Sequence, residues 1–169
     1  METNMKKYRH RISMLIAFTM VCSASQLTAA ETLGKVLRDA KWEGILGTWV
    51  DPKTKDVMRF SWKIKDRVIE QRDKVQNTEG VSLIGVNAKT GEVFEMGADS
   101  DGASSLATWT FKDNEAEVGA FVTTGDGQEA LVSLKYRRVD AATMPVKMFL
   151  PGVPAPLLSL TMKRKKTGK

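Results

Sequence analysis

Apolar and polar side chains alternate with a period of two along most of this chain, and turn-forming residues interrupt the alternation about every 8 to 12 positions. The clearest case is residues 57–64, where Met58, Phe60 and Trp62 share one face and Arg59 lies on the other. Successive side chains of a β-strand point to opposite faces. The pattern therefore predicts an antiparallel all-β domain.

Turn signals divide the alternating segments into about nine expected strands. The proline turn at 51–54 and the glycine turn at 125–127 are among these signals. The expected strands span 45–50, 57–64, 67–76, 81–87, 92–98, 103–111, a segment around 118–122, 129–139 and 157–163. Because short connections join consecutive strands, we predict an up-and-down meander of about 8–10 strands that closes into a barrel and so has no exposed edge.

Two segments depart from the alternation. Residues 31–41 carry apolar side chains at helical spacing, among them Leu33 and Leu37, and we expect a short N-terminal helix there. Residues 143–156 contain four of the five prolines of the chain. Proline cannot donate to a strand ladder, so we expect this segment not to form a central strand.

The first 30 residues have the order of a secretory signal. Basic residues from Lys6 to Arg11 precede an apolar run at 12–24, and the small residues Thr28 and Ala30 follow. The run is shorter than the roughly 20 residues of a membrane-spanning helix. We therefore predict that residues 1–30 are a cleaved signal peptide, that the protein is exported to the periplasm or secreted, and that it has no integral membrane segment.

The only histidine, His10, and the only cysteine, Cys22, both lie in the predicted signal peptide. The mature chain then lacks the side chains that most often transfer protons, attack substrates or bind metals near neutral pH. We therefore expect no catalytic residue, no metal and no cofactor, and favour binding over catalysis. Lipid attachment at Cys22 is an alternative, but Thr19 and Val21 do not fit a lipoprotein signal.

Carboxylates are the remaining route to catalysis. Two of them in one cleft can hydrolyse a glycosidic bond, and Glu70, Glu92 and Glu95 are the candidates in this sequence. Charged residues on strands more often form a solvated face, so a carboxylate-dependent hydrolase is the less favoured hypothesis. Asp99–Gly102 resembles the start of a calcium loop but lacks the later ligands, and we interpret it as a turn.

The basic character of the chain is concentrated at its ends. The net charge is +6, and much of the excess comes from the predicted signal peptide and the C-terminal tail. We expect one barrel domain at 31–163 and a basic tail at 164–169. The tail either contacts anionic surfaces or is simply a solvated chain end, and the sequence leaves both alternatives open. We expect no nucleic-acid partner.

A short amphipathic helix followed by Gly47-Thr48-Trp49 and a meander of hairpins resembles the calycin group of lipocalin and fatty-acid-binding-like barrels. The chain is also similar to exported bacterial barrel domains of unassigned function, which share the Gly-x-Trp opening and a later Gly-x-x-x-x-Thr-Gly turn, here 85–91. The resemblance implies a lipocalin-like barrel with a ligand inside. It also implies that Trp49, with Gly47, closes one end of the barrel against Arg137, Arg138 or Lys163.

The strand pattern itself gives candidates for ligand contacts. Five aromatic residues are expected on the inner face of the sheet: Phe60, Trp62, Trp109, Phe111 and Tyr136. Small residues among them, such as Ala107 and Ala120, could leave a cavity, although core packing is the usual role of such side chains. We predict a small hydrophobic or amphipathic ligand. An interaction module that uses the proline-rich apolar segment 144–158 is the alternative hypothesis.

Overall fold

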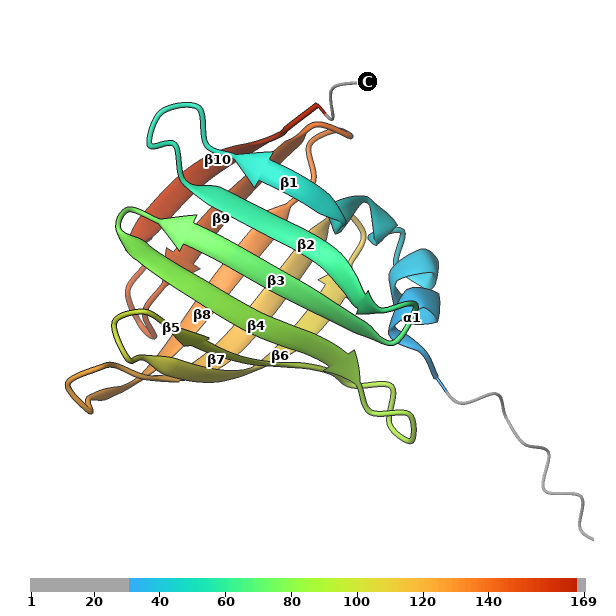
Figure 1. Cartoon of the computed structure of the whole chain (residues 1–169), viewed down its shortest axis with the longest axis horizontal. Helices are drawn as coiled ribbons and strands as arrows, with labels where there is room; N and C mark the ends of the chain where they lie inside the picture. The colour runs from blue at the N-terminus through green and yellow to red at the C-terminus, as the bar shows by residue number, and fades with distance from the viewer. Residues whose placement is uncertain (1–30, 167–169) are drawn as a thin grey trace, which may run out of the picture.

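The computed structural model describes residues 31–166. The predicted signal peptide, with His10 and Cys22, lies outside the described residues, as does the end of the basic tail. Within residues 31–166 the chain forms ten antiparallel strands, one α-helix and one 3-10 turn, and the strands surround a single interior (Figure 1).

The described elements follow one another with short connections. They are α1 (Leu33–Asp39), η1 (Glu43–Ile45), β1 (Gly47–Val50), β2 (Val57–Ile64), β3 (Val68–Val75), β4 (Thr78–Val86), β5 (Val93–Asp99), β6 (Ser104–Lys112), β7 (Glu115–Thr123), β8 (Glu129–Arg137), β9 (Thr143–Phe149) and β10 (Leu158–Arg164). The helix lies inside the expected range 31–41. Most strands lie within a few residues of their expected positions, although β4 begins earlier, at Thr78.

Each strand pairs with its neighbours in the chain, and β1 pairs with β10 to close the barrel. The closing seam is short, since it joins Trp49 to Arg164 and Val50 to Lys163. The predicted all-β, up-and-down closed barrel is confirmed. This architecture is consistent with a calycin-like fold.

The proline-rich segment corrects one expectation. β9 contains Pro145, yet it pairs with both β8 and β10. Its pairing with β8 stops at Tyr136 and Val146, and does not include the preceding residue Pro145. The proline therefore lies beyond the end of the ladder to β8, so its missing N–H breaks no pair of that ladder. Only residues 150–157 form the exposed loop that we expected over a longer range.

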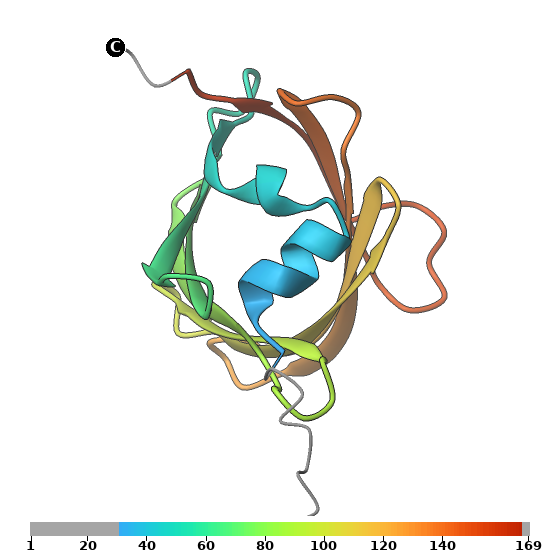
Figure 2. The ribbon, with the colours of Figure 1, turned by 90° about the vertical axis from the view of Figure 1, so that its right-hand side faces the viewer.

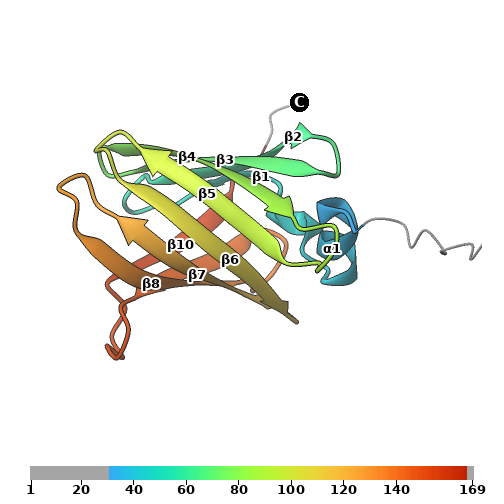
Figure 3. The ribbon, with the colours of Figure 1, turned by 90° about the horizontal axis from the view of Figure 1, so that it is seen from below.

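The helix covers one end of the barrel. Thr32 caps α1 by accepting a hydrogen bond from the Lys35 N–H. Figure 2 shows α1 and η1 lying across the barrel end, and Figure 3 shows that they lie at one end of the molecule only. Leu33, Leu37 and Trp42 are almost fully buried there. The barrel thus has a capped end and an uncapped end.

Candidate ligand cavity

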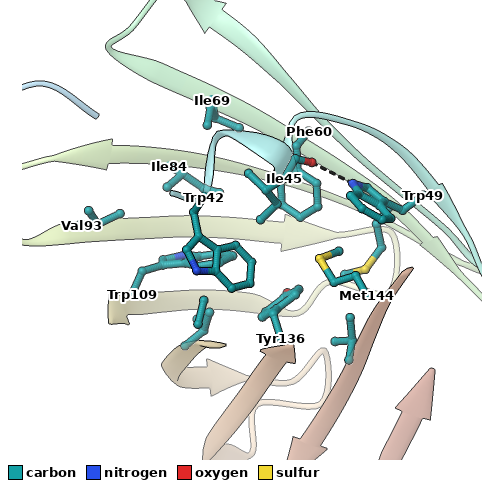
Figure 4. Close-up of a cluster of buried hydrophobic side chains, with 14 of the residues drawn as sticks. Trp42, Ile45, Trp49, Phe60, Ile69, Ile84, Val93, Trp109, Tyr136 and Met144 are labelled. Carbon is teal, nitrogen blue, oxygen red and sulfur yellow. Dashed lines mark hydrogen bonds between the residues drawn. The ribbon is translucent and has the colours of Figure 1, made fainter. Parts of the chain in front are cut away.

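The predicted aromatic residues gather mainly in the capped half of the barrel. Trp109 stacks on Phe111 at 5.9 Å and on Tyr136 at 5.1 Å between ring centroids. Trp42, just after the helix, packs against Phe111 at 5.9 Å. Figure 4 shows Trp42, Trp109, Phe60 and Tyr136 within one packed cluster. All five predicted aromatic residues belong to the core or pack against it.

The space among these rings is almost filled. The void bounded by Phe60, Trp109, Phe111 and the helix has a volume of ≈ 10 Å³. Trp62 is half-buried near the barrel wall, with the Lys65 ammonium 5.5 Å from its ring. Of the five aromatic residues, Tyr136 alone also lines a larger cavity. A ligand-contacting role for the other four stays a prediction from the sequence.

A cavity of ≈ 220 Å³ lies in the uncapped half. Val75, Met148 and Leu158, at the strand ends away from α1, form its outer part. Its lining residues come from β2 to β10: Met58, Gln71, Asp73, Val75, Ser82, Glu95, Ser105, Ala107, Val118, Ala120, Val122, Val132, Leu134, Tyr136, Val146, Met148, Leu158 and Leu160. The strand pattern predicts only some of these residues, such as Ala107, Ala120 and Tyr136, on the inner face.

The cavity has two chemically different walls. On β7 to β10 the lining is apolar apart from Tyr136, with Val118, Val132 and Leu160 as examples. On β3 to β6 it is mainly polar, apart from Val75 and Ala107, and the strand register explains why. Gln71 lies opposite Ser82, Ser82 opposite Gly97 and Gly97 opposite Ser105. The register thus lines up one row of polar and small residues across four strands.

Two glycines give the polar side chains room. A Cβ on Gly97 would lie 2.4 Å from the Ser82 hydroxyl oxygen, and a Cβ on Gly80 would lie 2.7 Å from a carboxylate oxygen of Asp73. Any larger residue would therefore displace these polar groups. The lack of side chains at Gly80 and Gly97 lets Asp73 and Ser82 lie close over the sheet.

The two cavity carboxylates are held in unfavourable surroundings for a negative charge. Burial raises the pKa of Glu95, and the charge of Asp73 adds to this increase, whereas hydrogen bonds from Ser82 and Trp109 oppose it. The Trp109 indole N–H donates to Glu95 Oε2 at 2.7 Å. Burial also raises the pKa of Asp73, with a contribution from the charge of Asp99 and an opposing hydrogen bond from Gln71.

Gln71 carries an unsatisfied acceptor at this wall. Its side chain lines the cavity and the residue is only 5% exposed. Among the described residues, its Oε1 is the one buried side-chain oxygen or nitrogen without a hydrogen-bond partner. Leaving such a group unpaired costs about 1–3 kcal/mol, so a donor that reaches Oε1 from the cavity would recover part of this cost.

A second hollow adjoins the cavity at the uncapped end. It has a volume of ≈ 180 Å³ and shares Asp73, Ser82 and Ser105 with the cavity lining. Asp99 lines it as well, and the Asp99 carboxylate accepts the N–H groups of Asp101 and Ala103 in the following turn. The entrance to the cavity is therefore acidic.

The structure does not bring the three candidate catalytic glutamates together. Glu70 accepts hydrogen bonds from Arg72 at 2.8 Å and Lys63 at 3.1 Å, and these two cations lower its pKa to about 2. Glu92 is exposed just before β5. Only Glu95 lines the cavity. A hydrolase that pairs two of these glutamates therefore gains no support from the geometry.

The partner of the Trp49 ring is Arg164, which the sequence predicts in the basic tail. The Arg164 guanidinium lies 4.3 Å from the centroid of this ring, so the expected partners Arg137, Arg138 and Lys163 are wrong. Arg138 lies instead over Trp42, at 5.8 Å. The register across the closing seam pairs Trp49 with Arg164. Only knowledge of that pairing would have identified the arginine from sequence.

The segment of the alternative interaction hypothesis divides into two parts. Met144 and Val146 are buried in β9, and Met148 and Leu158 line the cavity. The exposed large apolar side chains of this segment lie in residues 150–157, and Leu157 is the most exposed of them at 62%. An apolar surface over the whole of 144–158 is therefore wrong.

The described residues contain no group of three or more histidine, cysteine, aspartate or glutamate side chains that could hold a metal ion. No helix in residues 31–166 is long and apolar enough to cross a membrane.

No protein-family model matches the sequence, and no curated protein matches it either. Fold and cavity together define a closed ten-stranded antiparallel barrel with a half-polar interior.

Proposed function

We propose that this protein is a non-enzymatic binding protein that holds one small amphipathic molecule in the barrel cavity. The observation that carries the proposal is the buried, unpaired Oε1 of Gln71 on the polar wall. Binding sites for small molecules are mostly apolar with a few convergent polar groups. The cavity matches this description, because an apolar wall on β7 to β10 faces a wall that carries this acceptor.

The volume limits the size of the ligand. An engineered cavity of about 150 Å³ takes up benzene, whereas sites for drug-sized molecules start at roughly 300 Å³. The cavity here, at ≈ 220 Å³, lies between these cases. We therefore expect a ligand of roughly six to ten non-hydrogen atoms, lying with its apolar part against the residues of β7 to β10.

We also propose that the protein works after export, in the periplasm or outside the cell. The support is the order of residues 1–30, basic then apolar then small. Expression of the full chain in bacteria, followed by fractionation and mass spectrometry, tests this. A mature protein that begins at Glu31 in the exported fraction is the expected result, and full-length protein retained in the cytoplasm contradicts the proposal.

A filled cavity tests the binding function. Ala120 lines the cavity from β7, and Ala120→Leu places extra atoms in it. We expect the variant to fold with stability close to that of the wild type and to lose binding of 1-octanol, measured by titration calorimetry. Thr110→Leu is the matched control, because Thr110 is exposed on β6 and its substitution leaves the interior unchanged. Octanol binding that is retained in Ala120→Leu contradicts the proposal, as does a wild type that binds no octyl compound.

A further inference from the structure

We propose that the natural ligand carries a protonated primary amine, which binds at the polar wall formed by Gln71, Asp73 and Glu95. This inference rests on the proposed function, because it names the chemical class of the molecule in the same cavity. It has to be tested separately, since an uncharged ligand would satisfy the proposed function and not the inference.

The charges of the cavity favour a cation. Asp73 and Glu95 line it, and Asp99 lies at its entrance. Among the described residues that line the cavity there is no lysine or arginine. A carboxylate or phosphate on the ligand would meet these groups without any countercharge, which is costly in a buried site. An ammonium group would supply the missing positive charge.

The number of acceptors favours an amine over a hydroxyl. A primary ammonium has three N–H donors, whereas a hydroxyl has one. The polar wall offers the unpaired Oε1 of Gln71 together with the carboxylates of Asp73 and Glu95. One ammonium can therefore satisfy the buried amide oxygen and bond to carboxylates at the same time. Hydrogen bonds in which the donor or the acceptor is charged are about twice as strong as neutral ones.

A bare metal ion fits the wall less well. Divalent cations in proteins take several oxygen or nitrogen ligands at once, and the described residues hold no group of three or more suitable side chains. A metal ion would also leave the apolar wall of β7 to β10 without a partner. An amine on a short hydrocarbon chain occupies both walls.

The test compares three ligands with the same chain and different head groups: n-octylamine, 1-octanol and octanoate. Titration calorimetry of the wild-type protein at pH 7 should give the order octylamine, octanol, octanoate, with octylamine at least about tenfold tighter than octanol. If octanol or octanoate binds as tightly as octylamine, the inference fails and the proposed function stands. If none of the three binds, the proposed function itself fails.

Paired variants locate the amine. Glu95→Gln removes a cavity charge while keeping the shape, and should weaken octylamine binding about tenfold, a larger factor than for octanol. Glu117→Gln is the matched control, because the Glu117 side chain is 55% exposed on the outside of β7. Equal effects of both variants overturn the assignment. Should Glu95→Gln fail to fold, Asp73→Asn replaces it, and the wild-type comparison of ligands decides without either.

A second, independent observation concerns the outside of the barrel. The register places five exposed apolar residues side by side across β4 to β8: Leu83, Met96, Leu106, Phe121 and Leu131. Leu106 and Leu131 are 61% and 60% exposed, and Met96 is 50% exposed. Phe94 and Val81 extend this apolar row. Isolated exposed apolar residues are ordinary, but a continuous row of this length marks an interaction surface.

The geometry points to a second copy of this chain as the partner of the apolar row. Gly119 lies beside the row, and a Cβ there would have no atom within 4 Å. It forms part of a hollow of ≈ 590 Å³ that Leu106, Phe121 and Leu131 border. The same face thus carries protruding leucines and a hollow for them, as a two-fold symmetric interface requires.

The exposed area agrees with a weak dimer. At about 200 Å² for each fully exposed large side chain, the row and its two neighbours expose on the order of 600 Å². Two copies would then bury on the order of 1,200 Å², which is the lower limit for specific interfaces. We therefore expect dimers that dissociate on dilution.

Sedimentation equilibrium over a range of protein concentrations tests the dimer. The wild type should show a reversible monomer–dimer equilibrium, and Leu106→Lys should be monomeric throughout. Ile64→Lys is the matched control, because Ile64 is a 57% exposed apolar residue of β2 outside the row, and it should dimerise like the wild type. A monomeric wild type, including one that binds lipid vesicles instead, overturns the proposal, as does a dimer that survives Leu106→Lys.

Discussion

Asp51 shows how one buried carboxylate organises the start of the barrel. Its Oδ1 accepts the N–H groups of Lys53 at 2.7 Å and Thr54 at 3.1 Å. Its Oδ2 accepts the N–H of Thr161, on β10, at 2.6 Å. Burial acts to raise the pKa of Asp51, but these hydrogen bonds outweigh burial and leave the pKa below its ordinary value. The side chain therefore joins the β1–β2 turn to the last strand.

Asp51→Ala should destabilise the protein by roughly 2–4 kcal/mol, because it leaves buried N–H groups without their charged acceptor. Urea unfolding at pH 7 measures this. The contribution of Asp51 is complete above pH 3.8, its ordinary pKa, and is lost as the pH falls through the lower folded-state pKa. The difference between variant and wild type should therefore shrink in acid. A loss equal to that of Glu129→Ala, an exposed control on β8, contradicts this role.

Glu95 has the opposite pH dependence. Its folded-state pKa is raised, mainly by burial, above the ordinary value of 4.5. The folded state then holds the proton more tightly than the unfolded state, so the contribution to stability is favourable in acid and is lost as the pH rises above 4.5. Asp73, whose pKa is raised for the same main reason, acts in the same direction.

Glu95→Gln removes this titration. Relative to the wild type, the variant should gain stability as the pH rises from about 4.5 towards 8, while its hydrogen bond from Trp109 can be retained by the amide oxygen. Urea unfolding of both proteins at several pH values gives the difference, and Glu117→Gln provides the control for an exposed carboxylate. A difference that stays constant with pH would show that Glu95 is not perturbed by burial.

At the scale of elements, one arginine ties β10 to Trp49 of β1 and to the segment that leads into β1. The strand has four residues and meets β10 in a short seam. Arg164 lies over Trp49 and donates to the carbonyl of Leu46 at 2.7 Å, to that of Ala141 at 3.0 Å and to that of Gly44. Gly47, at φ 127°, has no room for a Cβ, which would lie 2.6 Å from the guanidinium.

Arg164→Ala should therefore cost about 2–4 kcal/mol and speed hydrogen exchange in β1 and β10 more than elsewhere. Lysine cannot replace the planar donor group, so Arg164→Lys should recover little. Lys163→Ala is the neighbouring control, because Lys163 is exposed and its ammonium contacts only the Thr143 hydroxyl among the hydrogen bonds described. Uniform exchange rates in Arg164→Ala would contradict a local role at the seam.

Strand periodicity made most of the elements predictable, because alternation such as that of residues 57–64 depends only on the two faces of a strand. Pairing was less predictable. Pro145 would rule out a strand only if the strand were paired on both sides at that residue. It is paired with β10 alone, and the point at which the β8 ladder ends depends on register. For the same reason, Arg164 looked like the first residue of a basic tail, whereas its pairing with Trp49 makes it part of the barrel.

At the scale of the molecule, the barrel has a packed half and a hollow half. The sequence predicts that Phe60, Trp109 and Tyr136 face inward, and they do. It does not predict their height along the barrel axis, because that height follows from the stagger of the strands. The rings therefore fill the half under α1, and smaller residues such as Ala107 and Ala120 leave the cavity. Glu95, a candidate catalytic carboxylate in the sequence, lies in the polar wall of this cavity.

The two halves should respond separately to substitution. Leu37, in α1, is 2% exposed and lines the nearly filled void of the capped half rather than the cavity. Leu37→Ala should cost about 2–5 kcal/mol, because it removes buried atoms that neighbours replace only in part. The affinity for 1-octanol should stay within about twofold, because effects at sites without shared partners add independently.

Ala120→Leu should show the reverse, with stability near that of the wild type and octanol binding lost. Urea unfolding and titration calorimetry on both variants measure the two properties in parallel, and the double variant should combine both losses. If Leu37→Ala abolishes octanol binding while remaining folded, the helix supports the cavity directly and the two halves are one unit. If stability and octanol binding respond independently in the two variants, the helix-capped half maintains the fold. The charge and size of the residues in the open half can then suit the ligand without a loss of stability.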